Sequence, residues 1–183
     1  MDRRQRKTRE AIFTAFTALL AEKDFGKITV GEIIARADVG RATFYAHFET
    51  KDFLLRELCG ELFCHIFDAM EENPDGHRHI FTCDAPDSAF LHLFRHLQQN
   101  DNGILTLLTC RNNELFLQEF RKQFRELLRR QPALLPAGKS GSLPEDFRMH
   151  HAASAFVETV RWWMENGRKE SAETVTGYFL QIV

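Results

Sequence analysis

Several features that would define other classes of protein are scarce or absent in this chain of 183 residues. No run approaches the roughly 18 apolar residues of a membrane-spanning helix, and the N-terminus opens on charged residues rather than an apolar signal segment. The four cysteines show no framework spacing, so we expect free, buried thiols. With 24 basic against 26 acidic residues, the chain is not a uniformly basic nucleic-acid coat. These absences favour a cytoplasmic protein that uses neither a membrane nor a disulfide scaffold.

Proline and glycine are also few, five and ten, and they cluster between long segments whose apolar residues repeat with the period of a helix. Hydrophobic residues make up 44% of the chain, enough to bury a core. The pattern predicts an all-α fold of about nine helices, with one domain over 1–50 and a second over 51–183. The first seven helices are expected at about 4–22, 29–37, 41–48, 51–71, 86–99, 102–110 and 113–130.

The second and third predicted helices are short and are joined by a tight turn. A capping box, Thr29 to Glu32, opens the first of them, and Asp38, Val39 and Gly40 form the turn. Phe44 and Phe48 lie four residues apart in the second and are expected to pack inward. This is the layout of a helix-turn-helix, whose second helix lies in the major groove of DNA.

The residues left outside have side chains suited to DNA. Arg41 can bind the O6 and N7 atoms of guanine, Thr43 can contact a thymine methyl group, and Tyr45 can donate to a phosphate. Ala42 permits a close approach, and basic residues at the N-terminus could reach phosphates or the minor groove. The DNA-binding residues that we expect are Thr29, Arg41, Ala42, Thr43, Tyr45, His47, Lys51, Arg4 and Arg6.

The stretch TVGEIIARADVGRATFYAHFETKDFLL resembles the TetR family of transcriptional regulators, and the similarity covers about residues 8–58. The family signature reads approximately Thr-x-x-x-Ile-Ala-x-x-Ala-Gly-Val-Ser-x-Gly-Thr-Phe-Tyr-x-Tyr/His-Phe-x-x-Lys-x-x-Leu. Asp38 replaces its turn glycine, but aspartate tolerates the left-handed backbone better than most residues. Gly40 replaces its serine, so a hydroxyl contact to phosphate is missing. The resemblance implies a homodimeric repressor that a small-molecule effector releases from a palindromic DNA operator.

The resemblance further implies that the last two helices form the dimer and that the others enclose an effector pocket. Apolar residues cover a wide arc of the last two helices. Phenylalanines at helical spacing could line a pocket for an apolar or aromatic compound, although ordinary core packing is the alternative for each of them. The expected dimer residues are Val160, Trp163, Val175, Tyr178, Phe179 and Ile182. The expected ligand-binding residues are Phe63, Phe67, Phe90, Phe94, Phe116, Phe120 and Phe156.

Two other classes of function stay open. His77, His79 and Cys83 share a loop, and His92 and His96 lie four residues apart, but neither group is a complete metal-ligand set. We therefore assign no metal site, no cofactor and no enzyme activity, since the nucleotide-binding and hydrolase motifs are absent. The alternatives to a DNA-binding regulator are a helical dimerisation or interaction module without DNA binding, and a metal or redox sensor.

Overall fold

The computed structural model describes residues 3–70, 88–99, 107–108, 114–135 and 143–183. Within them the regular structure is helical and no strand occurs, which confirms the all-α prediction. The α-helices are α1 (Arg3–Glu22), α2 (Val30–Ala37), α3 (Arg41–His47), α4 (Lys51–Met70), α5 (Ala89–Gln99), α7 (Glu114–Arg130), α8 (Glu145–Glu165) and α9 (Ala172–Ile182). Short 3-10 helices cover Phe25–Lys27 and Pro132–Leu134. The helix expected at about 102–110 lies outside the described residues, except for Leu107 and Leu108, which are helical and buried.

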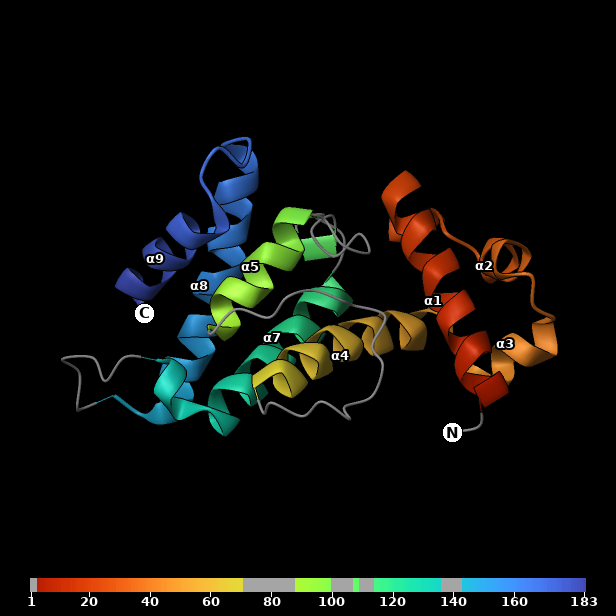
Figure 1. The fold of residues 1–183 in the computed structure, drawn as a ribbon, viewed down its shortest axis with the longest axis horizontal. Helices are drawn as coiled ribbons and strands as arrows, with labels where there is room; N and C mark the ends of the chain where they lie inside the picture. The colour runs from red at the N-terminus through yellow and green to blue at the C-terminus, as the bar shows by residue number, and fades with distance from the viewer. Residues whose placement is uncertain (1–2, 71–87, 100–106, 109–113, 136–142) are drawn as a thin grey trace.

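Helices α1, α2 and α3 form a unit at one end of the molecule (Figure 1). Phe13 on α1 meets Phe48 edge to face, with ring centroids 5.4 Å apart, and Phe44 lies 5.9 Å from Phe48. All three rings are buried, which confirms that Phe44 and Phe48 pack inward. The aromatic contacts fix α3 against α1, so the outer face of α3 is held on a rigid support.

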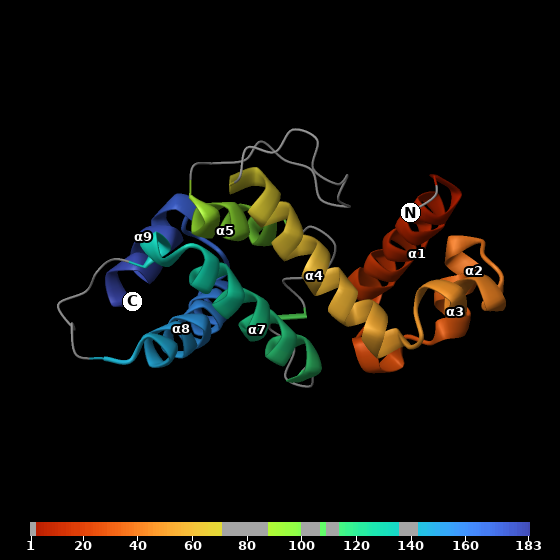
Figure 2. The same cartoon turned by 90° about the horizontal axis from the view of Figure 1, so that it is seen from below.

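Helix α4 runs from this unit into the rest of the molecule (Figures 1 and 2). Its 20 residues span about 30 Å. Near its start, Arg9 of α1 donates to Glu57 at 2.5 Å and to Glu61 at 3.4 Å. Farther along, α4 packs against α5 and α7. A change in the direction of α4 relative to α5 and α7 would therefore move the N-terminal unit.

The second unit is a layer of helices in which α5 packs on α9, and α8 packs on both α7 and α9. Its core is largely aromatic: Phe124 lies 4.8 Å from Phe156, and Phe94 lies 4.7 Å from Phe156. Trp163 is fully buried, and its indole N–H donates to the carbonyl of Glu170 at 3.0 Å. The turn before α9 places Gly167 at a φ of 71°, the left-handed backbone that glycine adopts without strain.

Three histidines are buried in this unit as well, His65 on α4 and His92 and His96 on α5. The pKa of His92 is lowered to about 3, chiefly by burial and then by the neighbouring His96 and His65. The ring of His92 is therefore neutral at pH 7.

The two described cysteines lie in different surroundings. Cys59 is buried on α4, and burial raises its pKa well above the ordinary value. Cys64 is exposed, contrary to our expectation of buried thiols, because it lies on the outer face of α4. Cys83 and Cys110 lie outside the described residues, as do His77 and His79. None of the described helices combines the length and the hydropathy that crossing a membrane requires.

Candidate nucleic-acid interface

The first helix of the predicted motif, α2, is fixed at its start by the capping box. The Thr29 hydroxyl accepts from the backbone N–H of Glu32 at 3.2 Å, and the Glu32 carboxylate accepts from the N–H of Thr29 at 2.9 Å. Lys23 of the first unit donates to the same carboxylate. The bond from Lys23 is the largest cause that lowers the pKa of Glu32 to about 2, followed by the bonds to its carboxylate from the Thr29 N–H and from the Thr29 hydroxyl at 3.0 Å. Thr29 is exposed, as a residue that contacts DNA must be. Its hydroxyl, however, is already engaged in the capping box.

The turn between α2 and α3 has the backbone that its sequence suggested. Asp38 adopts the left-handed conformation, with φ 52° and ψ 48°, and its N–H donates to the carbonyl of Ile34. Gly40 precedes α3 without a side-chain cap, and its carbonyl accepts from the N–H of Phe44 at 3.0 Å. Aspartate therefore supports the turn in place of glycine, while the start of α3 lacks the stabilisation that a serine hydroxyl would give.

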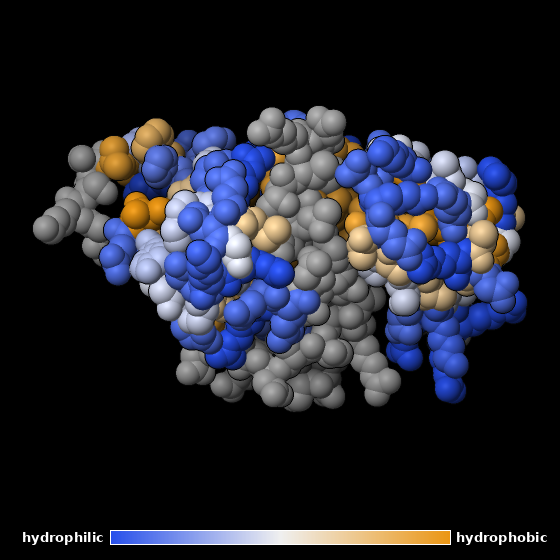
Figure 3. Space-filling view, turned by 90° about the horizontal axis from the view of Figure 1, so that it is seen from above, coloured by the Kyte–Doolittle hydropathy of each residue, from blue (hydrophilic) through white to orange (hydrophobic). Residues whose placement is uncertain are grey.

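Helix α3 presents Arg41, Ala42 and Thr43 to solvent. Among the residues that the structure describes, Arg41 forms no ion pair, so its guanidinium is available to an outside partner. Tyr45 is 45% exposed and leans edge-on against Phe44, with centroids 5.4 Å apart. The Tyr45 ring is thus partly exposed and supported by the buried ring of Phe44. The N-terminal unit, at the right of Figure 3, shows mainly hydrophilic side chains on the face seen there.

His47 ends α3 and is half-buried beside Phe48, with ring centroids 6.3 Å apart. Its imidazole therefore lies at the edge of the exposed face of α3, rather than at its centre.

The structure corrects the role that we expected for Lys51. Its ammonium donates to the carbonyls of Phe25 and Ile28 at 2.9 and 2.8 Å and lies 4.2 Å from the centroid of the Phe25 ring. Two of its three N–H bonds are thereby used within the chain. Lys51 thus joins the start of α4 to the segment before α2, and only its third N–H is left for a phosphate. The charge of Lys51 could be read from the sequence, but the direction of its side chain could not.

The basic residues at the N-terminus are arranged on a helix. Arg4 and Arg6 lie exposed in the first two turns of α1, which begins at Arg3, so they do not form an extended arm. Arg6 lies 3.7 Å from Glu10, an exposed pair that contributes little. Arg9 is turned inward to Glu57 and Glu61 and lies over the rings of Phe13 and Phe48. Arg4 and Arg6 remain candidates for phosphate contacts, and Arg9 is a structural residue.

The residues that we expected to bind an effector are all buried in the second unit. Phe120 lies within 5.1 Å of Phe63, 5.8 Å of Phe156 and 6.2 Å of Phe116, measured between centroids. Phe90 and Phe94 join the same aromatic cluster through Phe124 and Phe156. Phe67 is also buried, but its ring lies 4.7 Å from the Arg130 guanidinium.

The residues that we expected at a dimer interface divide into two groups. Val160, Trp163, Val175 and Phe179 are fully buried within the chain, so their side chains cannot reach a partner. The prediction was wrong for these four because apolar residues surround much of α8 and α9, and sequence periodicity does not separate the inner face from the outer one. The exposed members are Tyr178 and Ile182, at 44% and 64%.

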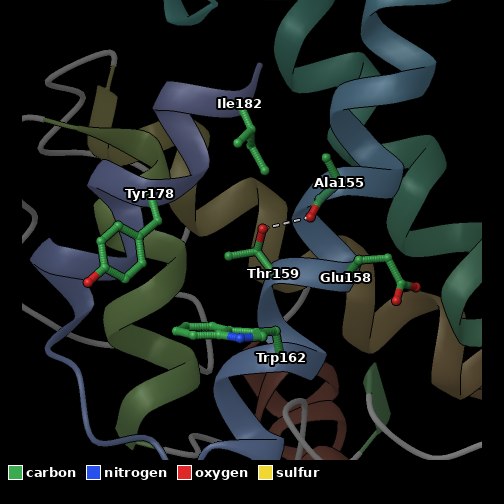
Figure 4. A pocket seen from close by; sticks show the side chains of 6 residues that line it. All are labelled: Ala155, Glu158, Thr159, Trp162, Tyr178 and Ile182. Carbon is green, nitrogen blue, oxygen red and sulfur yellow. Dashed lines mark hydrogen bonds between the residues drawn. The ribbon is translucent and has the colours of Figure 1, made fainter.

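These two exposed residues line an apolar groove between α8 and α9 (Figure 4). The groove has a volume of about 340 Å³ and is completed by Ala155, Glu158, Thr159 and Trp162. Trp162 is 41% exposed and faces Tyr178 across the groove, with ring centroids 6.0 Å apart. Hydrophobic side chains also reach the surface at the left end of Figure 3, the end at which α9 lies in Figure 1.

Comparison with known protein families finds a matching family model for each of the two units. Residues 12–58 match the model described as bacterial regulatory proteins of the tetR family. Residues 84–183, more than half of the chain, match the model of a transcriptional regulator C-terminal region. The chain belongs to the TetR family of transcriptional regulators. This family consists of DNA-binding regulators rather than enzymes.

Solved structures agree with this assignment. The TetR transcriptional regulator from Streptococcus agalactiae 2603V is 36% identical, with a TM-score of 0.74, over 100% of this chain and 96% of that one. The regulator FadR from Bacillus subtilis, in complex with stearoyl-CoA, shares the fold at 21% identity and a TM-score of 0.60, over 94% and 95% of the two chains.

The HTH-type transcriptional regulator YxbF of Bacillus subtilis (strain 168) is 40% identical over 78 residues, which cover 40% of this chain and a fifth of YxbF.

The inward position of Lys51 in this TetR-family chain leads to a testable prediction. Lys51→Met keeps the aliphatic stem but removes both hydrogen bonds, so the free energy of unfolding should fall by about 2 kcal/mol. The salt dependence of DNA binding should not change. Urea unfolding and a salt titration of DNA binding measure the two quantities. Lys27→Met is the control, since Lys27 is 75% exposed and should contribute almost nothing. If the slope of log DNA affinity against log salt concentration is smaller by about one in Lys51→Met, this role is contradicted.

The low pKa of Glu32 predicts a pH-dependent contribution to stability. Because the pKa is lower in the folded chain than its ordinary value of 4.5, the Glu32 carboxylate stabilises the fold above pH 4.5. That contribution should be lost as the pH falls from 4.5 toward 2. Urea unfolding of the wild type and Glu32→Gln measures it: the difference between them should be larger at pH 7 than at pH 2.5. A difference that does not vary with pH would refute the effect.

Proposed function

We propose that this regulator binds a two-fold symmetric DNA operator as a homodimer and acts as a repressor that a small apolar or aromatic effector releases. In this proposal residues 1–50 bind DNA, and residues 51–183 form the dimer and hold the effector. Helix α4 then connects effector binding to the position of α3, because it begins beside the DNA-binding unit and packs against α5 and α7.

One observation supports DNA binding most strongly: α3 exposes Arg41, Ala42 and Thr43 on a helix that Phe44 and Phe48 hold from behind. Small side chains beside an unpaired arginine permit the close approach that base contacts in the major groove require. This argument favours DNA over the alternative of an interaction module that has lost DNA binding.

A salt-dependent binding assay separates these two functions. Purified protein is titrated onto fragments of genomic DNA at about 50 and 200 mM salt, and the bound fraction is measured. A regulator that neutralises several phosphates should lose about a thousandfold or more in affinity over this range. An interaction module without DNA binding would show no binding at either concentration.

The groove between α8 and α9 supports a homodimer. Trp162, Tyr178 and Ile182 expose apolar surface there, which a second copy of the chain would cover through the same residues on its own α8 and α9. The symmetry of such a dimer would match the two half-sites of a palindromic operator.

The aromatic cluster is our candidate for the effector site. The fold can hold an apolar ligand, since the FadR structure of Bacillus subtilis contains stearoyl-CoA. Phe63 on α4 contacts Phe120 on α7, so a ligand entering between these rings would act directly on α4. Such a ligand must bind one conformer of the protein better than the other.

Phe120→Leu should therefore weaken effector binding while leaving ligand-free operator affinity nearly intact. A panel of aromatic and fatty-acyl compounds is first screened for release of bound DNA, and the affinity of an active compound is then measured for each variant. Phe16→Leu is the matched control, because Phe16 is equally buried but lies on α1 against Phe25, away from the aromatic cluster. If Phe120→Leu binds the compound normally and melts at a lower temperature, Phe120 is a core residue and the effector lies elsewhere.

A further inference from the structure

Three histidines from two helices meet inside the second unit. His65 lies on α4, and His92 and His96 lie four residues apart on α5. The ring centroid of His65 lies 4.9 Å from that of His92 and 5.0 Å from that of His96. The centroids of His92 and His96 are 5.0 Å apart. The three rings thus form a nearly equilateral triangle across the contact between α4 and α5. The sequence revealed only the pair on α5, because His65 joins it through tertiary packing.

The side chains are also enclosed. His92 and His96 are 1% and 3% exposed, and His65 retains 9%, which leaves one edge of the cluster near solvent. One ring nitrogen from each histidine lies within 4.8 Å of the other two. Among the described residues, no other group of three or more such side chains comes together in this way.

The spacing of the rings matches that of three imidazoles bound to a tetrahedral ion. With a Zn–N distance of about 2.0–2.1 Å, each ring centroid lies about 3.2 Å from the ion, and the tetrahedral angle then separates the centroids by about 5.2 Å. The observed separations are 4.9–5.0 Å. The ring nitrogens lie within 4.8 Å of one another and would converge to about 3.4 Å around the bound ion.

The donor set identifies the chemical class of the ion. Imidazole nitrogens suit Zn²⁺, Co²⁺, Ni²⁺ and Cu²⁺, whereas Mg²⁺ and Ca²⁺ prefer oxygen. Three protein ligands also leave one position of a tetrahedral ion for a further ligand. We propose that His65, His92 and His96 bind one divalent transition-metal ion, Zn²⁺ in particular, and that this ion joins α4 to α5 and changes DNA affinity.

The regulatory half of the proposal rests on the proposed function and on the position of α4. The N-terminal end of α4 is joined to the DNA-binding unit by the hydrogen bonds of Lys51 and by the ion pair of Arg9 with Glu57. An ion bound between α4 and α5 therefore restricts the element that determines where α3 lies. The factor by which the ion changes DNA affinity is set by the ratio of the ion's affinities for the two arrangements of α4.

Metal binding is tested first and without DNA. The full chain is treated with a chelator, dialysed and titrated with Co²⁺, and the visible absorption is recorded before Zn²⁺ is added in competition. We expect one ion per chain, the intense absorption of tetrahedral Co²⁺, and displacement by Zn²⁺. Weak octahedral absorption, or no saturable binding, would overturn the site irrespective of any DNA result.

Variants then assign the ligands. His65→Gln and His96→Gln should each lower metal affinity by about tenfold or more, whereas His151→Gln, an exposed histidine on α8, should leave it unchanged. Circular dichroism establishes that each variant is folded, and His65→Gln is the more tolerant test because His65 is the most exposed of the three. Folded variants that bind Co²⁺ as the wild type does would assign the ion to other residues and refute the proposal.

The coupling to DNA is measured last, with metal-free and Zn²⁺-loaded protein on the same DNA fragment. A difference of about fivefold or more is expected in the wild type, and none in His96→Gln. Metal binding without such a difference would refute the regulatory half alone. Absence of DNA binding in both states would refute the proposed function and leave the metal site intact.

Discussion

Replacing Trp162 and Tyr178 together by glutamate should convert the protein to a monomer of 21.3 kDa and lower its affinity for an operator by about a thousandfold or more. Both side chains line the apolar groove between α8 and α9, and each is more than 40% exposed in the single chain. Two carboxylates would have to be buried without partners in a dimer, whereas water solvates them in a monomer. A monomer contacts one half-site at a time, so the affinity gained from the second half-site is lost.

Sedimentation measures the mass, and fluorescence anisotropy with a labelled operator measures the affinity. Gln118→Glu on α7 is the control, because it adds a negative charge at an exposed position outside the groove. The buried residues do not suit this test: Phe179→Glu would place a charge in the core of one chain and prevent folding. A folded double variant that remains dimeric would place the interface on another surface.

The second large effect is expected for Arg41→Ala. Arg41 is exposed at the first turn of α3, and loss of a bidentate contact to guanine costs about 1–3 kcal/mol in each half-site. In a symmetric dimer the loss occurs twice, so operator affinity should fall by about thirtyfold or more. Affinity for unrelated DNA should fall much less, because only one positive charge per chain is removed.

Binding curves on an operator and on unrelated DNA of the same length give both numbers. Arg129→Ala removes the same charge from the end of α7, where Arg129 pairs with Glu126, and should leave the ratio of the two affinities unchanged. Tyr45→Phe should weaken binding to both DNAs alike, since it removes a hydroxyl suited to phosphate. Equal losses on both DNAs in Arg41→Ala would show that Arg41 contacts the backbone only.

Local sequence signals predicted the DNA-binding unit well because its structure is locally determined. The capping box of Thr29 and Glu32, the left-handed backbone of Asp38 and the inward rings of Phe44 and Phe48 each depend on residues within a few positions. The charge of a residue did not predict the direction in which its side chain points. Lys51 was expected on phosphate, yet two carbonyls from another segment bind its ammonium.

The second unit was harder to predict because its contacts join distant segments. Trp162 and Trp163 are adjacent in sequence, but one lines an exposed groove and the other is buried, a distinction that depends on how α8 rotates against α5, α7 and α9. The position of His65 beside His92 and His96 likewise depends on the contact between α4 and α5. Helical periodicity indicates that residues share a face, but it does not identify the partner of that face.

The most direct test of the account is selection of bound fragments from random DNA, followed by sequencing, with the wild type and Arg41→Ala in parallel. The account predicts that the wild type enriches a motif of two inverted half-sites about one helical turn apart. Arg41→Ala should lose base preference at one symmetric position in each half-site and keep the rest of the motif. Failure of the wild type to enrich any sequence, or an unchanged motif in Arg41→Ala, would contradict the claim that α3 reads DNA in a symmetric dimer.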